Sequence, residues 1–111
     1  MGKASRDKGK RGERELSNVL KEHGYKARRG VQYQGGSDSP DVIGLPGIHI
    51  ECKRTEKFRL EDAMQQAKED CDPFSLPAVF HRKNGKNWVV VMDLEDWLIL
   101  YDKYREPLEG E

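Results

Sequence analysis

The sequence has little cysteine and no long hydrophobic run. Only two cysteines, Cys52 and Cys71, occur among its 111 residues, which excludes a disulfide framework, and no Cys/His cluster has the spacing of a zinc site. The first 14 residues are almost wholly polar, and no apolar stretch reaches the length of a signal peptide or a membrane span. We therefore expect one small cytoplasmic domain without a membrane partner.

A net charge of either sign is also lacking, because 20 basic residues balance 20 acidic ones. The charges are unevenly placed: residues 1–30 carry ten Lys or Arg against four Asp or Glu, whereas residues 91–111 carry two against seven. We predict a flexible basic arm at residues 1–10, a single domain at 11–101 and an acidic tail at 102–111. For the arm, phosphate binding and simple solvation are two open interpretations.

The spacing of apolar residues predicts an α/β fold with a mixed sheet of the α+β type and the element order α-β-β-β-α-β-β-α. Three helices are predicted, over residues 13–23, from Leu60 for about three turns, and over 93–100. Five strands are predicted, over residues 25–31, 41–45, 48–53, 78–81 and 88–92. Pro46-Gly47 is a turn signal, so the second and third strands should form a hairpin.

Two carboxylates and a lysine stand where this hairpin brings its strands together. Along residues 48–53 the apolar side chains alternate with Glu51 and Lys53, which therefore share one face of the strand. Asp41 leads the neighbouring strand and can meet Glu51 across the hairpin. Mg²⁺-dependent phosphodiester hydrolysis needs carboxylates that hold a hard cation and a group that orients water. The main-chain carbonyl of Cys52 can complete the oxygen ligands.

The triplet Glu51-Cys52-Lys53 also has a plainer interpretation. In so charged a chain, roughly one or two acid-x-Lys triplets arise by chance, and Glu51 and Lys53 could form an ordinary surface ion pair. Asp38 is a rival to Asp41, although it lies in a polar loop rather than at the start of a strand. His49 shares the polar face of Glu51, so it could act near the scissile phosphate, although a strand histidine at the rim of the sheet is the commoner case. We favour the hydrolytic interpretation, because the triplet lies on the polar face of an otherwise apolar strand.

Four short motifs fall within residues 9–81. They are Gly12-Glu13-Arg14-Glu15-Leu16, His23-Gly24-Tyr25, Pro40-Asp41-Val42-Ile43 and Ile50-Glu51-Cys52-Lys53. Over this span the chain resembles the PD-(D/E)xK nuclease superfamily and, within it, the archaeal-type Holliday junction resolvases. The first motif is the most discriminating, since other branches of the superfamily share only the later ones. The resemblance implies a restriction-endonuclease-like core and nuclease activity.

The resemblance also implies roles for particular residues. Glu13, Asp41 and Glu51 would be the acidic metal-site residues, Lys53 would be the catalytic lysine, and Mg²⁺ would be the cofactor, with Mn²⁺ as a substitute. Hydrolysis would leave a 5′-phosphate and a 3′-hydroxyl. Glu13 has a plain alternative as a first-turn glutamate that favours the helix dipole. Its rival for the catalytic role is Glu15, and the resemblance favours Glu13.

DNA is the expected partner, and a four-way junction cut symmetrically by a homodimer is the substrate that the resemblance implies. Tyr33 is a candidate for stacking on a base or sugar. The candidate phosphate contacts are Lys10, Arg11, Arg28 and Arg29. Gln65 or Gln66 could touch the lysine or a phosphate, although both positions suit ordinary residues on a helix surface.

Three other functions stay open. The loop over residues 30–40 looks longer than in the resolvases, and the carboxyl-terminal part with Trp97 and Tyr101 does not match them. The first alternative is therefore a nuclease of the same fold that cuts single-stranded, flap or damaged DNA. The second is a non-catalytic DNA-binding recombination protein, although all four expected catalytic positions hold chemically competent residues. The third is a protein-interaction module that uses the acidic tail.

Overall fold

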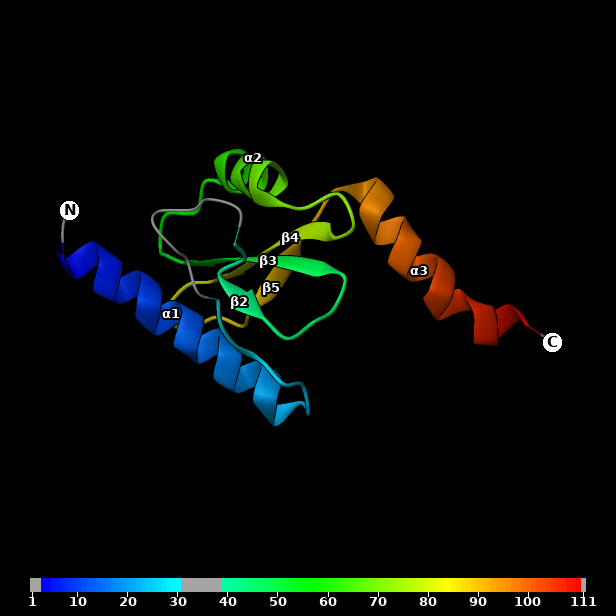
Figure 1. Ribbon diagram of the computed structural model, residues 1–111, viewed down its shortest axis with the longest axis horizontal. Coiled ribbons are helices and arrows are strands. Elements are labelled where there is room, and N and C mark those ends of the chain that lie inside the picture. The colour runs from blue at the N-terminus through cyan, green and yellow to red at the C-terminus, as the bar shows by residue number, and fades with distance from the viewer. Residues whose placement is uncertain (1–2, 31–38, 111) are drawn as a thin grey trace.

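The computed structural model describes residues 3–30 and 39–110, with the side chains of the first helix from Gly9 onward. Within these residues, five strands form one mixed sheet and three helices accompany it (Figure 1). The predicted element order and the α+β class are confirmed. The elements are α1 Lys3–Glu22, β1 Arg28–Arg29, β2 Val42–Ile43, β3 Ile48–Arg54, α2 Leu60–Asp70, β4 Leu76–Arg82, β5 Val89–Val91 and α3 Leu94–Glu109.

The sheet has the strand order β1-β2-β3-β4-β5. The pairs β1–β2, β2–β3 and β4–β5 are antiparallel, and the predicted hairpin is present, with Val42 opposite Ile50. Strands β3 and β4 run parallel in continuous register, and α2 is the crossover that parallel neighbours require. Strand β3 therefore lies at the centre of the sheet, paired on both edges.

A helix covers each face of the sheet, so β3 is enclosed on both sides. Helix α1 packs on one face through Leu16, and helix α2 packs on the other through Met64. The buried residues of the core beside α1 are Leu16, Ala27, Val42, Ile50, Ala78 and Phe80. The buried residues of the core beside α2 are Ala63, Met64, Ala67 and Val79. The domain thus consists of three layers, in the order helix, sheet, helix.

The polar face of β3 is buried, which the strand pattern did not predict. Ile50 points into the core beside α1, so His49 and Glu51 point to the opposite face, toward α2. Their exposed fractions are only 3% and 2%. The expected position of His49 at the rim of the sheet is therefore wrong, because α2 covers the surface that the alternation left polar.

Two helices are longer than the apolar periodicity predicts. Helix α1 begins at Lys3 rather than at residue 13, so residues 3–10 of the expected arm are helical. Helix α3 continues to Glu109 rather than ending near residue 100, and it includes most of the expected acidic tail. The strand predicted over 25–31 is reduced to β1. The flexibility assigned to the arm and tail stays a prediction.

Helix α3 extends away from the three layers (Figure 1). None of its side chains is buried, and its first turn is tied to α2 by an ion pair of 2.8 Å between Lys68 Nζ and Asp93 Oδ2. Over the part of the chain that the structure describes, no helix combines the length and apolar character needed to cross a membrane.

Candidate active site

Glu51 and Lys53 leave β3 on the same side, toward α2. Lys53 Nζ lies 3.8 Å from Glu51 Oε2, and about a third of the lysine side chain (33%) is accessible. Glu51 is almost fully buried, so this pair is not the surface ion pair that offered the plain interpretation. Burying an ionised carboxylate such as that of Glu51 costs free energy unless a positive charge or hydrogen bonds compensate it. Lys53 is only partly buried and lies 3.8 Å away, so a further positive charge could still approach Glu51.

Asp41 joins the pair from the chain just before β2. Its main-chain N–H donates to the carbonyl of Ile50 at 2.9 Å, which fixes Asp41 alongside β3. Its carboxylate Oδ2 accepts a hydrogen bond of 2.8 Å from the main-chain N–H of Cys52. Cys52 separates Glu51 from Lys53 in the sequence. The Asp41 carboxylate is therefore anchored at the centre of the Glu-x-Lys triplet.

Gly30 allows this placement of Asp41. The N–H of Gly30 donates to the carbonyl of Asp41 at 2.8 Å, at the point where the chain leaves β1. A Cβ atom added to Gly30 would lie 2.0 Å from the carbonyl oxygen of Pro40, which no real side chain tolerates. Only glycine therefore permits the two backbones to approach so closely.

The carboxylates act on one another. Burial raises the pKa of Asp41 from 3.8 to about 7, and the nearby charges of Glu51 and Glu13 act in the same direction. The hydrogen bond from Cys52 and the charge of Lys53 lower the Asp41 pKa without offsetting this rise. Burial, Asp41 and the other carboxylates also raise the pKa of the Cys52 thiol, which therefore stays protonated and unreactive. The positive charge of Lys53 therefore does not offset the burial of Asp41 and the charges of its acidic neighbours.

Glu13 faces this group from α1, whereas Glu15 does not. Glu13 Oε1 accepts a hydrogen bond of 3.0 Å from Arg29 Nε, and its charge contributes to the raised pKa of Asp41. Glu15 Oε1 instead binds Arg54 Nε at 3.0 Å and Arg82 Nη1 at 2.8 Å. Of the two rival glutamates, the geometry therefore places Glu13 in electrostatic reach of Asp41.

Glu15, Arg54, Arg82 and Glu56 form a second charged group, which we term the arginine cluster. Arg54 Nη1 lies 3.7 Å from Glu56 Oε2, so each acid of the cluster is close to a guanidinium. Helix α1 approaches β3 here, where a Cβ atom on Gly12 would lie 2.5 Å from Arg54 Cβ. Sequence reasoning missed this cluster, because its members come from three segments that lie far apart in the chain.

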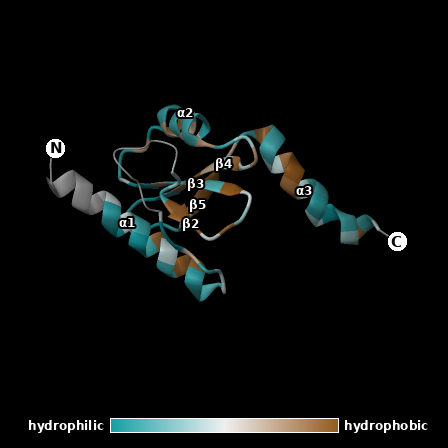
Figure 2. Cartoon of the chain, viewed as in Figure 1, coloured by the Kyte–Doolittle hydropathy of each residue, from teal (hydrophilic) through white to brown (hydrophobic). Residues whose placement is uncertain are grey.

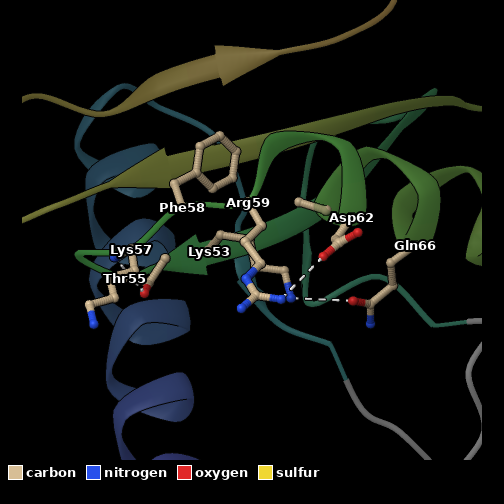
Figure 3. A pocket seen from close by; sticks show the side chains of 8 residues that line it. Lys53, Thr55, Lys57, Phe58, Arg59, Asp62 and Gln66 are labelled. Carbon is tan, nitrogen blue, oxygen red and sulfur yellow. Dashed lines mark hydrogen bonds and ion pairs between the residues drawn. The ribbon is translucent and has the colours of Figure 1, made fainter.

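Lys53 is held from a second element. Its Nζ donates to Gln66 Oε1 on α2 at 3.3 Å, and Figure 3 shows the two side chains meeting in front of the sheet. A cavity of about 320 Å³ lies beside them and is also lined by Lys57 and Arg59, which lie between β3 and α2. Gln65 points elsewhere and binds Glu69 Oε2 at 2.7 Å. Of the two glutamines, only Gln66 contacts the lysine.

His49 extends the buried polar face beyond the predicted site. Its Nε2 lies 3.9 Å from Glu51 Oε1 and has no hydrogen-bond partner, in a side chain that is almost inaccessible. The histidine therefore provides little direct compensation for the Glu51 charge. His23 and His81 bind main-chain carbonyls elsewhere.

The candidate DNA contacts are distributed differently. Lys10, Arg11 and Arg28 are exposed on α1 and β1, whereas Arg29 is half-buried and paired with Glu13. Tyr33 lies outside the described residues, as does Asp38, the rival to Asp41. The DNA contacts and the catalytic roles stay predictions.

Comparison with known families decides the relationship of the chain. The model of the archaeal Holliday junction resolvase (Hjc) family matches residues 4–92. The chain belongs to this family. No curated protein matches the chain in a sequence comparison. As a resolvase family member the chain is a nuclease that acts on DNA, and its mixed sheet with flanking helices is the restriction-endonuclease-like fold of these resolvases.

The resolvase match covers the whole site and ends before α3. Glu13, Asp41, Glu51 and Lys53 all lie within residues 4–92, whereas Leu94–Glu109 lies beyond them. The family relationship therefore accounts for the three-layer domain and leaves the exposed carboxyl-terminal helix to be explained from the structure.

The donor set of the resolvase fits a small hard cation that retains water ligands. In the described ranges, no three His, Cys, Asp or Glu side chains are arranged as a metal-binding group. Asp41 and Glu51 nevertheless provide two carboxylates that interact electrostatically, and the Cys52 main chain lies against Asp41. Mg²⁺ is typically bound by one or two carboxylates and several waters. The raised pKa of Asp41 indicates a site that gains from added positive charge.

Proposed function

We propose that this resolvase is a Mg²⁺-dependent, structure-selective endonuclease that acts as a homodimer and nicks two strands of a four-way junction symmetrically. The observation that carries the proposal is the placement of two buried, mutually repelling carboxylates, Asp41 and Glu51, beside Lys53. Two acids with so little compensation are costly in a structural role. The same two acids suit a site that accepts a divalent cation and a phosphodiester.

Asp41, Glu51 and the carbonyl of Cys52 would hold the cation, and Mn²⁺ would substitute for Mg²⁺ because it accepts the same oxygen ligands. When bound, the cation neutralises charge on the scissile phosphate and lowers the pKa of a bound water. The chain contributes the anchoring of both acids. The N–H of Cys52 fixes Asp41, and enclosure between α2 and the sheet fixes Glu51.

Lys53 orients the attacking water and stabilises the negative charge that develops on the phosphate. Its side chain is accessible enough to meet substrate, and Gln66 restrains its ammonium group near Glu51. A restrained donor needs less reorganisation during the reaction than a free surface lysine. Gln66 therefore acts as a positioning residue for Lys53.

Glu13 supports the cation from the α1 side, directly or through a water. Arg29 holds the Glu13 carboxylate by the 3.0 Å hydrogen bond and limits its mobility. Lys10, Arg11 and Arg28 hold the phosphates of the DNA arms, without reading their sequence. The products carry a 5′-phosphate and a 3′-hydroxyl, as the superfamily resemblance implies.

The proposal is tested by cleavage of labelled four-way junctions, flaps, single strands and plain duplex of matched sequence, with Mg²⁺ or with chelator. The variant is Lys53→Ala, and the matched control is Lys86→Ala, an exposed lysine in the turn between β4 and β5. We expect paired nicks in the junction that are lost with chelator and with Lys53→Ala, but not with Lys86→Ala.

Other outcomes separate the alternatives. Cleavage of flaps or single strands in preference to junctions would retain the site and change the substrate. Binding of every DNA without any cleavage would remove the enzyme function and favour a recombination accessory protein.

A further inference from the structure

A basic cavity lies beside the candidate active site, and two of its cations have no role in the proposed mechanism. It is the cavity of about 320 Å³ between the end of β3 and the start of α2, where Lys57 and Arg59 lie next to Lys53 (Figure 3). This volume falls at the lower end of the range of about 300–1,000 Å³ for ligand pockets in proteins. The cavity therefore suits one unit of a nucleic-acid strand rather than a duplex.

Positive charge dominates the lining of this cavity. Three of the lining residues are cationic, and Asp62 is the one acid among them. Arg59 Nη1 lies 3.8 Å from Asp62 Oδ2, but the two side chains are 85% and 74% exposed, so water screens most of their attraction. Lys57 is exposed and has no ion pair within the described part of the chain. Both cations are therefore available to an anionic ligand.

The segment that carries Lys57 and Arg59 is anchored to the domain. Phe58, which separates them in the sequence, packs against the core beside α2 and stacks on His81 with 4.0 Å between the ring centroids. The main-chain N–H of Lys57 donates to Thr55 Oγ1 at 3.3 Å. Figure 2 shows that the segment between β3 and α2 is otherwise mainly hydrophilic. Because the segment is already held at these points, it needs little ordering when a ligand binds.

A phosphate group fits this cavity better than a base does. Phe58 is the aromatic residue in the lining, and His81 covers one of its faces. Little ring surface therefore remains for stacking, which is the usual way in which proteins hold an unpaired base. Lysine and arginine side chains bind phosphate oxygens and do so without reading the sequence. The lining thus favours a phosphodiester as the ligand.

Lys53 connects the cavity to the cleavage site. Its Nζ lies 3.8 Å from Glu51 Oε2 and donates to Gln66, which also lines the cavity. Under the proposed function Lys53 meets the scissile phosphate, so the anion in the adjoining cavity belongs to the next phosphate along the same strand. The predicted contacts to the DNA arms lie elsewhere, on α1 and β1, and α1 covers the opposite face of the sheet.

We propose that Lys57 and Arg59 form a second phosphate subsite, which binds the phosphodiester next to the scissile one on the strand that is cut. The inference rests on the proposed function, because it requires that Lys53 face the scissile phosphate. Two neighbouring phosphates held at separate points fix the path of the strand across the cation site. The subsite therefore orients the substrate as well as adding affinity.

The test is a scan of neutral linkages in the DNA. Each four-way junction carries one methylphosphonate linkage near the branch point, and fluorescence anisotropy measures its affinity for the full chain in chelator. Cleavage of the unmodified junction in Mg²⁺ locates the scissile linkage. The variant is Lys57→Gln/Arg59→Gln, and the matched control is Lys83→Gln/Lys86→Gln, which removes the same charge from the exposed turn between β4 and β5. Circular dichroism checks that each variant folds.

Wild type should lose about tenfold in affinity when the linkage next to the scissile one is neutral. The unmodified junction should bind the Lys57→Gln/Arg59→Gln variant about tenfold more weakly than wild type. For that variant the neutral linkage should cost little more, because the two changes remove the same interaction. The control variant should keep the full sensitivity of wild type to that linkage.

The outcomes separate the subsite from the nuclease function. Equal losses of affinity in wild type and variant at the adjacent linkage, or a coupled linkage on a different strand, would overturn the subsite. Coupling at one linkage in a chain that cuts no DNA would instead sink the proposed function and leave Lys57 and Arg59 as a phosphate subsite.

Discussion

Two groups of acidic residues lie on either side of β3, and they are compensated very differently. In the arginine cluster, Glu15 contacts two guanidinium groups within 3.0 Å. In the candidate site, the charge of Glu51 contributes to the raised pKa of Asp41, and Lys53 Nζ lies 3.8 Å from Glu51 Oε2. The first group is neutralised by the chain itself. In the second, Asp41 keeps a raised pKa of about 7 despite the charge of Lys53.

The difference separates structural acids from reactive ones. Ion pairs that are satisfied within the fold hold α1 against β3 and β4. In the candidate site, burial and the charges of Glu51 and Glu13 instead raise the pKa of Asp41, which marks this carboxylate as a candidate functional group. Residue type alone does not make this distinction, since Glu13 and Glu15 are two positions apart on one helix and both pair with arginine, yet only Glu13 contributes to the raised pKa of Asp41.

The largest expected effect comes from removing charge at the uncompensated group. Glu51→Gln keeps the size of the side chain, and we expect the single-turnover rate of junction cleavage to fall on the order of 10³-fold. Folding and junction binding should be nearly unchanged, as measured by circular dichroism and fluorescence anisotropy. A cleavage rate close to that of wild type would remove Glu51 from the site.

Asp41→Asn should show how much the buried charge of Asp41 and its repulsion by neighbouring acids lower the stability of the cation-free protein. The folded state binds a proton at Asp41 up to about pH 7, whereas the unfolded chain loses it near 3.8, so wild-type stability falls as pH rises through this window. We expect Asp41→Asn to be more stable than wild type above pH 7, by about 1–3 kcal/mol.

Denaturant unfolding at several pH values measures this difference. The advantage of the variant should disappear below pH 4, where Asp41 is protonated in both states of wild type. Added Mg²⁺ at pH 8 should stabilise wild type and not the variant. A variant that is less stable at pH 8 would contradict the idea of crowded, uncompensated acids.

Glu15→Gln should have the opposite signature. The substitution leaves Arg54 and Arg82 without their shared acid, and we expect a loss of about 1 kcal/mol in the free energy of unfolding, since the pairs are partly exposed. Cleavage per folded molecule should stay at the wild-type level. A strong loss of cleavage with unchanged stability would transfer Glu15 to the active site.

Gln66→Ala should have the smallest effect. It removes the hydrogen bond that restrains Lys53, and we expect a loss of about threefold to tenfold in the cleavage rate, with junction affinity unchanged. Gln65→Ala is the matched control, because Gln65 contacts Glu69 instead. Equal effects of the two substitutions would argue against a specific role for Gln66.

The parts of the fold that repeat a local pattern could be predicted from the sequence. The alternation around Ile50 and the turn at Pro46-Gly47 specify β3 and its hairpin with β2, and these bring Asp41 to Cys52. Apolar spacing along Leu60–Asp70 likewise specifies α2. The main acids of the candidate site therefore followed from patterns within about a dozen residues.

Features that depend on distant packing could not be predicted. His49 is buried because α2 covers it. The alternation of apolar and polar residues along β3 does not predict where α2 packs. Apolar periodicity reports which residues of a helix are buried, and not whether a segment is helical. Because the residues before Gly12 have no such periodicity, the start of α1 was missed. Helix α3 persists to Glu109 with the support of ion pairs such as Arg105 to Asp102, which a search for apolar positions overlooks.

The hydrogen bonds around Asp41 and Lys53 also bear on how the protein folds. Asp41 to Cys52 spans 11 residues and Lys53 to Gln66 spans 13, whereas Glu15 to Arg82 spans 67. Short loops close with a smaller entropy cost than long ones. We expect the hairpin that holds the candidate catalytic residues to form early, and α1 to dock through the arginine cluster late.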